Sequence, residues 1–345
     1  MDTMRKLAVI VPLALLLAAC GGSSNKAADT TSGVVTKPTH TLKVGLVTDI
    51  NQLNDRGFNH LAYVGLLRAE KQLGVKGKVL QSPSAQDYIP NLSSLAQQGY
   101  DLVVGVGFDQ AAAIDKVAGK FPKTHFAIID VDQQSLQHKP ANVLGLLFRE
   151  QEAGYLVGYL AGLEAKKLHG STVSSVGGQK QPPVDRYIAG YQAGAKAADP
   201  GVKLLNGYSQ DWVDTTKCKE LALNQIAAGS KVVFQVAGGC GLGVLDAAKQ
   251  KGVWGIGVDA DQSFLGPQVL TSALKRVDAA VFNTVRQVQD GTFQGGTNAV
   301  FGLDRNGVGL GKVSAKVPAK ALQSLQAIEK KIVSHQLGSI PTTVK

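Results

Sequence analysis

The chain has 345 residues, 44% of them hydrophobic and 6% aromatic, and a formal net charge of +10. Its length exceeds what one hydrophobic core usually organises, so we expect two domains of roughly 120–170 residues each. The positive charge is spread along the chain and no basic run interleaves with aromatic residues, so we do not expect nucleic acid as a partner.

The first 20 residues have the pattern of an export signal. Basic residues at 5–6 precede an apolar run over 7–17, which is too short to span a bilayer comfortably. The run Leu17-Ala18-Ala19-Cys20 resembles the lipobox of bacterial lipoproteins. That resemblance implies cleavage before Cys20, lipidation of this cysteine, and an exported protein anchored to the outer face of the cell membrane or to a periplasmic face. An ordinary signal peptide and an uncleaved anchor are the alternatives.

Residues 21–40 are predicted to form a flexible linker. The segment is rich in Gly, Ser, Thr, Asn and Ala and shows no hydrophobic period, so it lacks the residues to build a core. We expect it to hold the folded part of the chain away from the lipid.

From position 42 the chain alternates short apolar runs with longer amphipathic ones. In the first half, strands are predicted over 42–48, 101–105 and 126–130, with helices between them. In the second half, strands are predicted over 171–176, 202–207, 231–236 and 253–258, and helices over 184–198, 217–228 and 242–251. This rhythm predicts an α/β protein with parallel sheets covered on both faces.

The remaining elements are expected to connect the two halves. A helix over 150–163 is predicted where the chain first crosses, and the C-terminal part should form a helix over 273–290, a strand over 298–303 and a helix over 318–335. We therefore expect an N-terminal lobe made of 41–148 plus 268–298. The C-terminal lobe would consist of 149–267 plus 299–345.

The residues that directly follow the predicted strands are the candidates for a binding site, because ligands of open parallel sheets bind beyond the carboxyl ends of the strands. These positions are Asp49, 107–108, Asp130, 177–178, 209–214, 238–243 and 259–262. Three of the turns carry aspartate, and others carry glycine or aromatic residues. Carboxylates that face one cleft suit a neutral ligand with several hydroxyl or amine donors.

Short motifs that together resemble those of one protein family are distributed along the whole predicted mature chain. They are 45–49, 55–59, 121–122, 126–130, 150–158, 176–178, 190–194, 237–239, 256–262 and 270–275. In order and spacing they resemble the BMP family, the basic membrane proteins, which are substrate-binding lipoproteins of ABC importers. The resemblance implies a type I periplasmic-binding-protein fold, in which two Rossmann-like lobes with parallel sheets are joined by a hinge of several crossovers.

Several members of that family bind nucleosides, and the resemblance assigns the base contacts residue by residue. Asp49 and Asn59 would approach the base, Phe58 would stack on it, and Asp130 would contact its edge nitrogens. Trp212 stands where many members have Phe, which would keep an aromatic stack and change the width of the pocket. A purine nucleoside is the favoured ligand.

The same resemblance assigns the sugar contacts to the second lobe. Asp259 would take the ribose hydroxyls, with Lys275 close by. Gly238 and Gly239 would let backbone amides approach the sugar. The implied partners are the small-molecule ligand and the permease subunits of an ABC importer, with the protein acting as a monomer.

Each of these residues also has a purely structural interpretation. Phe58 fits the apolar face of a helix, and Asp49 or Asp130 could cap a following helix. Lys275 could be a solvated helix residue. Trp212 lies in a polar loop over 209–214, where burial for packing alone is harder to explain.

Cysteine and glycine positions leave further alternatives. Cys218 and Cys240 are expected at the same edge of the second sheet, either as a disulfide or as two buried free thiols. The glycines over 238–243 lack the GxGxxG spacing and a following lysine, so a phosphate loop is not supported. The histidines show no metal-ligand spacing, so neither a metal nor a cofactor is expected.

Function therefore has one leading hypothesis and several alternatives. The leading hypothesis is a lipid-anchored receptor that closes two lobes on a nucleoside and performs no chemistry. The alternatives are a receptor for a sugar or another polar solute, a ligand sensor, and a nucleoside-processing enzyme. The enzyme is disfavoured because the aspartates show no clustering typical of a metal or of an acid–base pair.

Overall fold

The computed structural model describes residues 39–169 and 172–344. The predicted export signal, Cys20 and nearly all of the predicted linker lie outside the described residues. The first strand is β1 (Lys43–Val47).

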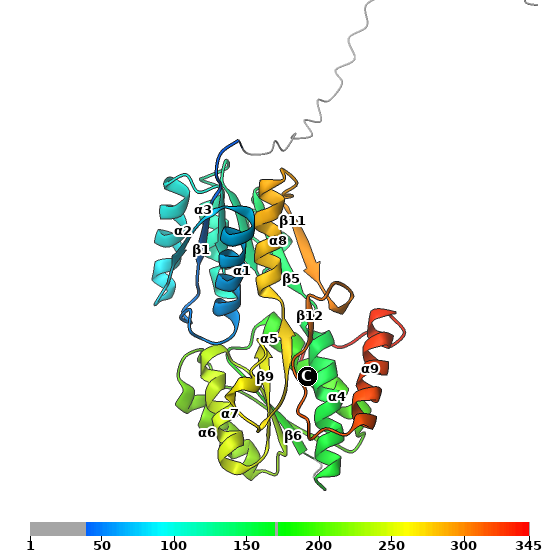
Figure 1. The fold of residues 1–345 in the computed structure, drawn as a ribbon. Coiled ribbons are helices and arrows are strands. Elements are labelled where there is room, and N and C mark those ends of the chain that lie inside the picture. The colour runs from blue at the N-terminus through cyan, green and yellow to red at the C-terminus, as the bar shows by residue number, and fades with distance from the viewer. Residues whose placement is uncertain (1–38, 170–171, 345) are drawn as a thin grey trace, which may run out of the picture. The chain divides into compact units, whose positions relative to one another are not determined.

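The first lobe is built on a parallel sheet with the strand order β11-β5-β4-β3-β1-β2. The remaining strands are β2 (Lys76–Leu80), β3 (Leu102–Gly105), β4 (His125–Ile129), β5 (Val143–Phe148) and β11 (Thr297–Phe301). Helices α1 (Phe58–Leu73) and α8 (Val277–Gln289) cover one face, and α2 (Tyr88–Gln97) and α3 (Ala111–Ala118) cover the other (Figure 1). The central strands are thus buried on both faces, as their continuous apolar runs predict.

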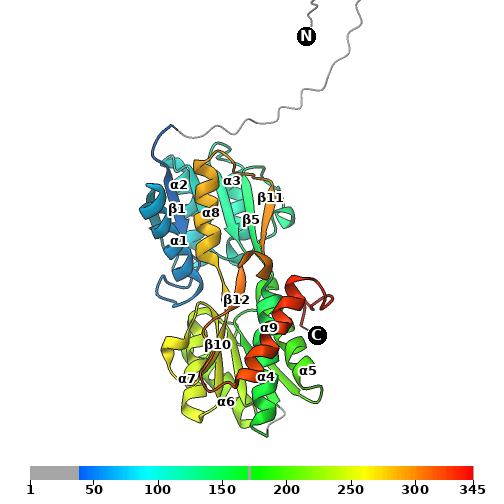
Figure 2. The same cartoon turned by 45° about the vertical axis from the view of Figure 1, so that its right-hand side comes forward.

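The second lobe repeats this architecture with the order β12-β10-β9-β8-β6-β7. Its strands are β6 (Thr172–Gly177), β7 (Lys203–Tyr208), β8 (Val232–Val236), β9 (Trp254–Asp259), β10 (Val269–Lys275) and β12 (Val308–Leu310). Only β12 is antiparallel to its neighbour. The helices are α4 (Glu150–Lys167), α5 (Pro182–Ala198), α6 (Thr215–Ala227), α7 (Leu242–Lys251) and α9 (Ala319–Val333). Helix α9 packs on the outside of α4 (Figure 2).

Helices α4 and α5 pack unusually close together because glycines lie at their contact. A Cβ added at Gly158 would lie far inside van der Waals distance of the Tyr191 carbonyl oxygen, and one at Gly194 would meet the Tyr155 carbonyl oxygen in the same way. This close contact between the two helix backbones sets the position of α5. The first turns of α5 lie between the two lobes.

In the described part of the chain, the backbone passes between the lobes at three places. The first crossing joins β5 to α4 at residues 148–150, the second joins β10 to α8 at 275–277, and the third leaves β11 at 301–303. The two α/β lobes with mainly parallel sheets confirm the fold class predicted from the sequence.

The predicted allocation of 268–298 to the first lobe is wrong for strand β10. This strand lies in the second sheet between β9 and β12, and β11 belongs to the first sheet as far as Phe301. The predicted helix over 273–290 therefore begins only at Val277. The error has a physical cause: β10 is buried along nearly its whole length, and its buried residues include the polar Thr271 and Ser272, so its sequence shows no polar–apolar alternation that would mark it as a strand.

Candidate functional site

A cavity lies between the carboxyl ends of the two sheets. The first lobe lines it with Asp49, Asn51, Phe58, Gly107, Phe108, Asp109 and Asp130. The second lobe lines it with Gln181, Pro183, Val184, Tyr187, Trp212, Val236, Gly238, Val258, Asp259 and Lys275. The cavity therefore lies where open α/β sheets place their ligands.

Seven of the nine ligand residues predicted from the sequence line this cavity. They are Asp49, Phe58, Asp130, Trp212, Gly238, Asp259 and Lys275. The other two, Asn59 and Gly239, do not line it. Asn59 lies behind Asp49, and Gly239 lines a neighbouring groove, with its N–H 3.4 Å from the Asn51 side-chain oxygen.

Asp49 is held in place by the polar groups of its own lobe. The Asn59 side-chain amide donates to Asp49 Oδ1 at 2.6 Å and to the Asn51 carbonyl at 2.7 Å, and the Asn51 N–H donates to the same Asp49 oxygen at 2.9 Å. Burial raises the pKa of Asp49 to about 7, and these hydrogen bonds oppose the rise. Asn59 is therefore a residue that positions Asp49.

The cap of helix α1 comes from a different aspartate. Asp55 accepts hydrogen bonds from the N–H groups of Gly57, Asn59 and His60 at 2.8–3.1 Å. These bonds satisfy free donors of the first turn, which begins at Phe58. Asp55 thereby fixes the helix end that carries Phe58 into the cavity.

Lys275 is the centre of a buried charge network at the hinge. Its Nζ lies 2.6 and 2.7 Å from the two Asp130 oxygens and 2.9 Å from Glu150 Oε1, and the other Glu150 oxygen pairs with Arg186 Nε at 2.6 Å. Burial by itself lowers the pKa of Lys275, but the negative charges of Asp130 and Glu150 outweigh it and the pKa lies above its ordinary value.

The alternative that Lys275 is a solvated helix residue is wrong. Lys275 is the last residue of β10 and is 2% exposed. Its Nζ lies 5.1 Å from the centre of the Phe58 ring and 4.9 Å from that of Phe148, within range of cation–π attraction. The network thus joins both lobes next to two of the three crossings.

Asp259 faces the cavity from the end of β9. The Tyr187 hydroxyl lies 3.5 Å from Asp259 Oδ1 and 3.4 Å from the Ala273 carbonyl. Burial raises the pKa of Asp259 to about 7, partly offset by Lys275. Asp259 and Asp130 both have positive φ angles, 62° and 72°, which non-glycine residues adopt at a cost. Strain of this kind at two facing carboxylates is typical of a functional site.

The aromatic walls come from both lobes. The Trp212 ring lies directly over Gly178, where a Cβ would collide with it. Phe58 and Phe108 line the cavity from the first lobe. The Gln181 side-chain amide of the second lobe donates to Asp109 Oδ1 of the first lobe at 2.6 Å. Burial raises the pKa of Asp109, and the polar groups of Gln181 and Trp212 oppose that rise.

Sequence reasoning missed several lining residues, above all Asp109, Gln181 and Tyr187. Phe108 had a signal, because it follows a predicted strand. Gln181 directly precedes the Pro at the start of α5, so it could have been inferred from the helix start after β6. Tyr187 lies within α5, and nothing in the local sequence separates it from a core residue.

The second lobe carries a covalent link beside the cavity. Cys218 and Cys240 are joined in a disulfide, with their Cα atoms 5.6 Å apart. Among residues 39–169 and 172–344, no three His, Cys, Asp or Glu side chains are grouped to hold a metal ion. Within the same ranges, no helix has both the length and the apolar character that a membrane crossing requires.

Comparison with known proteins identifies the family. Residues 42–343 match the Bmp family, described as PnrA-like ABC transporter substrate-binding proteins. The chain is 35% identical to an ABC transporter nucleoside-binding protein of Lactococcus lactis, over 87% of this chain and 89% of the relative. It is 36% identical to a protein of Pyrococcus horikoshii named a lipoprotein, over 86% of this chain and 74% of the relative.

A solved structure agrees with this match. The solute-binding protein of an ABC transporter system from Aeropyrum pernix superposes with a TM-score of 0.78 at 26% identity, covering 86% of this chain and 92% of that one. The neighbour has the periplasmic-binding-protein type of fold that the two parallel sheets predict. The chain belongs to the Bmp family of ABC transporter substrate-binding proteins.

Proposed function

We propose that this protein is the lipid-anchored receptor of an ABC importer and that it binds a nucleoside, with purines favoured, by closing its two lobes. The family supplies the coarser part of this proposal, a small-molecule ligand and a permease partner outside the cytoplasm. The cavity chemistry supplies the argument for the ligand. The protein is expected to act as a monomer and to perform no chemistry on its cargo.

The observation that carries the proposal is the charge of the cavity. Four carboxylates line it, those of Asp49, Asp109, Asp130 and Asp259, and among the described lining residues Lys275 is the one basic group. Lys275 is already paired with Asp130. The remaining acceptors favour a neutral ligand rich in N–H and O–H donors, and they repel a phosphate group.

A nucleoside matches the spatial order of these groups. Phe58 and Trp212 would stack on the base, and such pairs contribute about 0.5–1.5 kcal/mol each beyond area burial. Asp49 and Asp130 would accept from the base edge. Asp259 would accept both hydroxyls of the ribose, and hydrogen bonds to a charged group in a dry site contribute roughly 1.5–3 kcal/mol each.

Closure of the lobes around the ligand is supported by contacts that span the cleft. The Gln181 to Asp109 bond measures 2.6 Å, and Gln262 Nε2 lies 3.4 Å from the Arg56 carbonyl oxygen. Each contact joins residues of different lobes, and both Gln181 and Asp109 line the cavity. Three backbone crossings would act as the hinge, and opening would break these contacts and expose the cavity.

The anchor places the receptor beside its permease. Lipidation of Cys20 would tether it, and residues 21–40 would let it move relative to the membrane. Cys20→Ser should release the protein into the soluble fraction. Retention of that variant at the membrane with an intact leader would contradict the lipid anchor and favour a plain signal anchor.

The ligand is tested by a thermal-shift screen of the mature protein against nucleosides, the matching monophosphates, sugars and amino acids. A nucleoside at 100 times its dissociation constant should stabilise the protein by about 2.7 kcal/mol, and the monophosphates should stabilise it far less. A shift with a sugar or an amino acid and none with any nucleoside would contradict the proposed ligand and favour another polar solute.

A further inference from the structure

Two neighbouring backbone segments form one part of the cavity wall in the second lobe. One is the loop 209–214 after β7, which carries Trp212. The other is the turn 238–241 after β8, which carries Gly238. The two segments contact each other directly, because the Cys240 N–H donates to the Trp212 carbonyl at 2.8 Å.

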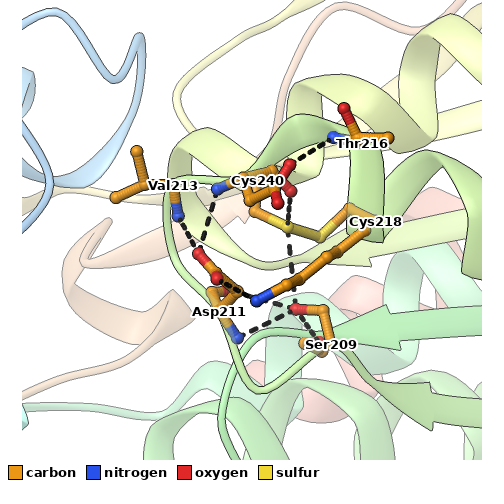
Figure 3. A network of polar contacts seen from close by, with 9 residues as sticks. Ser209, Asp211, Val213, Thr216, Cys218 and Cys240 are labelled. Atoms are coloured by element: carbon orange, nitrogen blue, oxygen red, sulfur yellow. Dashed lines mark hydrogen bonds and ion pairs between the residues drawn. A yellow bond between two sulfur atoms is a disulfide. The ribbon is translucent and has the colours of Figure 1, made fainter.

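Loop 209–214 is fixed by its own hydrogen bonds, which Figure 3 shows. The Asp211 carboxylate accepts from the N–H groups of Val213 and Asp214, both at 2.9 Å, and from Lys217 Nζ at 2.7 Å. The Ser209 hydroxyl donates to the Asp211 carbonyl at 3.0 Å. These bonds lower the pKa of Asp211 to about 2, so the loop keeps its charge-assisted bonds throughout the physiological range.

The disulfide joins the base of this loop to the adjacent turn. Cys218 lies in the first turns of α6, directly after the loop, and Cys240 lies in the turn that contacts Trp212. Figure 3 shows the bond between Cys218 and Cys240. Together with the hydrogen bond from the Cys240 N–H to the Trp212 carbonyl, this bond closes a ring of backbone that runs through Trp212, Cys218 and Cys240. Both cysteines are fully buried, in a small apolar cluster with Val176 and Ala237.

We propose that the Cys218–Cys240 disulfide is a positioning element of the ligand site, which holds Trp212 and Gly238 at the spacing that the ligand requires. The ring leaves Trp212 little freedom to move away from the turn, so the aromatic wall exists before the ligand arrives. Less ordering then has to occur on binding, which raises affinity. Because both sulfur atoms are buried, the link persists while the lobes open and close.

The expected effect on affinity rests on the proposed function. The claim that the disulfide holds Trp212 in place does not depend on it. The chain has two tryptophans, Trp212 and Trp254, and Trp254 is in β9. In a Trp254→Phe background, emission therefore reports Trp212 alone. The emission maximum and iodide quenching of the ligand-free protein then measure how firmly Trp212 is held, whatever the ligand is.

The test compares Cys218→Ala/Cys240→Ala with the parent protein in the Trp254→Phe background. We expect a red-shifted and more easily quenched Trp212 in the free protein, and a drop of about tenfold or more in affinity for guanosine or adenosine. Leu66→Ala, a core change in the first lobe, is the control: it should lower the melting temperature without changing Trp212 quenching.

Cys218→Ser/Cys240→Ser removes the same bond and keeps side chains close in size to cysteine, so it provides a second variant if the alanine variant does not fold. It should increase Trp212 quenching in the same direction. Unchanged quenching in whichever of the two cysteine variants folds would overturn the inference. Failure of the parent protein to bind any nucleoside would overturn the proposed ligand and leave the quenching result to decide the positioning role.

Discussion

In the first lobe, the cavity wall is held by hydrogen bonds between buried polar side chains and neighbouring amides, as where Asn59 holds Asp49 and Asp55 holds the start of α1. In the second lobe, backbone packing and a covalent bond add to the hydrogen bonds of loop 209–214: Gly158 lets α4 and α5 meet, and Cys218 is bonded to Cys240. The two lobes share an architecture, yet different interactions make their sites rigid.

Because of this difference, we expect the two lobes to be destabilised by different kinds of substitution. Removal of a polar partner should damage the first lobe and the hinge, because it leaves a buried group unsatisfied. Added volume should damage the second lobe, because its helices have no space to yield. Single substitutions in the two lobes and at the hinge test this contrast.

Lys275→Met should have the largest effect, because it leaves Asp130 buried without its paired cation and leaves Glu150 with Arg186 alone. Breaking a buried ion pair in this way costs about 3–5 kcal/mol. Urea denaturation of the ligand-free protein measures the loss. Lys219→Met removes a pair on the surface and should cost less than about 1 kcal/mol. Similar losses for the two variants would contradict the central role given to Lys275.

Gly158→Ala should destabilise the second lobe by about 1–3 kcal/mol or more, because its Cβ would press on the Tyr191 carbonyl. Thermal unfolding followed by circular dichroism measures the change. Gly119→Ala is the matched control, since a Cβ there meets no atom within 4 Å and its φ is not positive. If both variants melt alike, close packing of α4 on α5 does not limit stability.

Asn59→Ala should cost about 1–3 kcal/mol in stability, because it removes a donor from the buried Asp49. It should also raise the pKa of Asp49 further, since the bond from Asn59 lowers that pKa. Nucleoside affinity near neutral pH should fall as more Asp49 becomes protonated. Carboxyl resonances in NMR titrations of both proteins provide the measurement, and an unchanged pKa would refute this role of Asn59.

The smallest effect is a pH dependence with opposite signs for stability and for affinity. Burial raises the pKa of Asp259 from 3.8 to about 7, so the folded protein binds the proton more tightly than the unfolded chain does. The contribution of Asp259 to stability is therefore highest below pH 4 and is lost as pH rises towards 7. Nucleoside affinity should instead rise over pH 6–8, because the ionised carboxylate accepts both ribose hydroxyls.

Asp259→Asn isolates this contribution. Its unfolding free energy should depend less steeply on pH between 4 and 7 than that of the wild type, and its affinity should lose the rise near pH 7. Equal slopes in the two proteins would show that Asp259 is ionised throughout this range.

Much of the site could be predicted from the sequence, because the turns after buried strands locate the cavity edge. Asp49 and Asp130 come shortly after such strands, and Asp259 is the last residue of one. Tyr187 could not be predicted in this way, since it reaches the cavity through the packing of α5 on α4, which depends on glycines in both helices. The burial of Lys275 could not be predicted from the sequence either. Its partners Asp130 and Glu150 lie at the end of β4 and the start of α4, far from Lys275 along the chain.

The most direct test of the central claim is calorimetric titration of the mature protein with guanosine, 2′-deoxyguanosine, guanosine monophosphate and ribose. We expect one site per chain, tight binding of guanosine, and at least tenfold weaker binding of the deoxy compound, because Asp259 would lose a donor. The monophosphate should bind weakly because the cavity is rich in carboxylates. Binding of ribose alone, or equal binding of guanosine and its monophosphate, would contradict the proposal that the cavity binds a nucleoside.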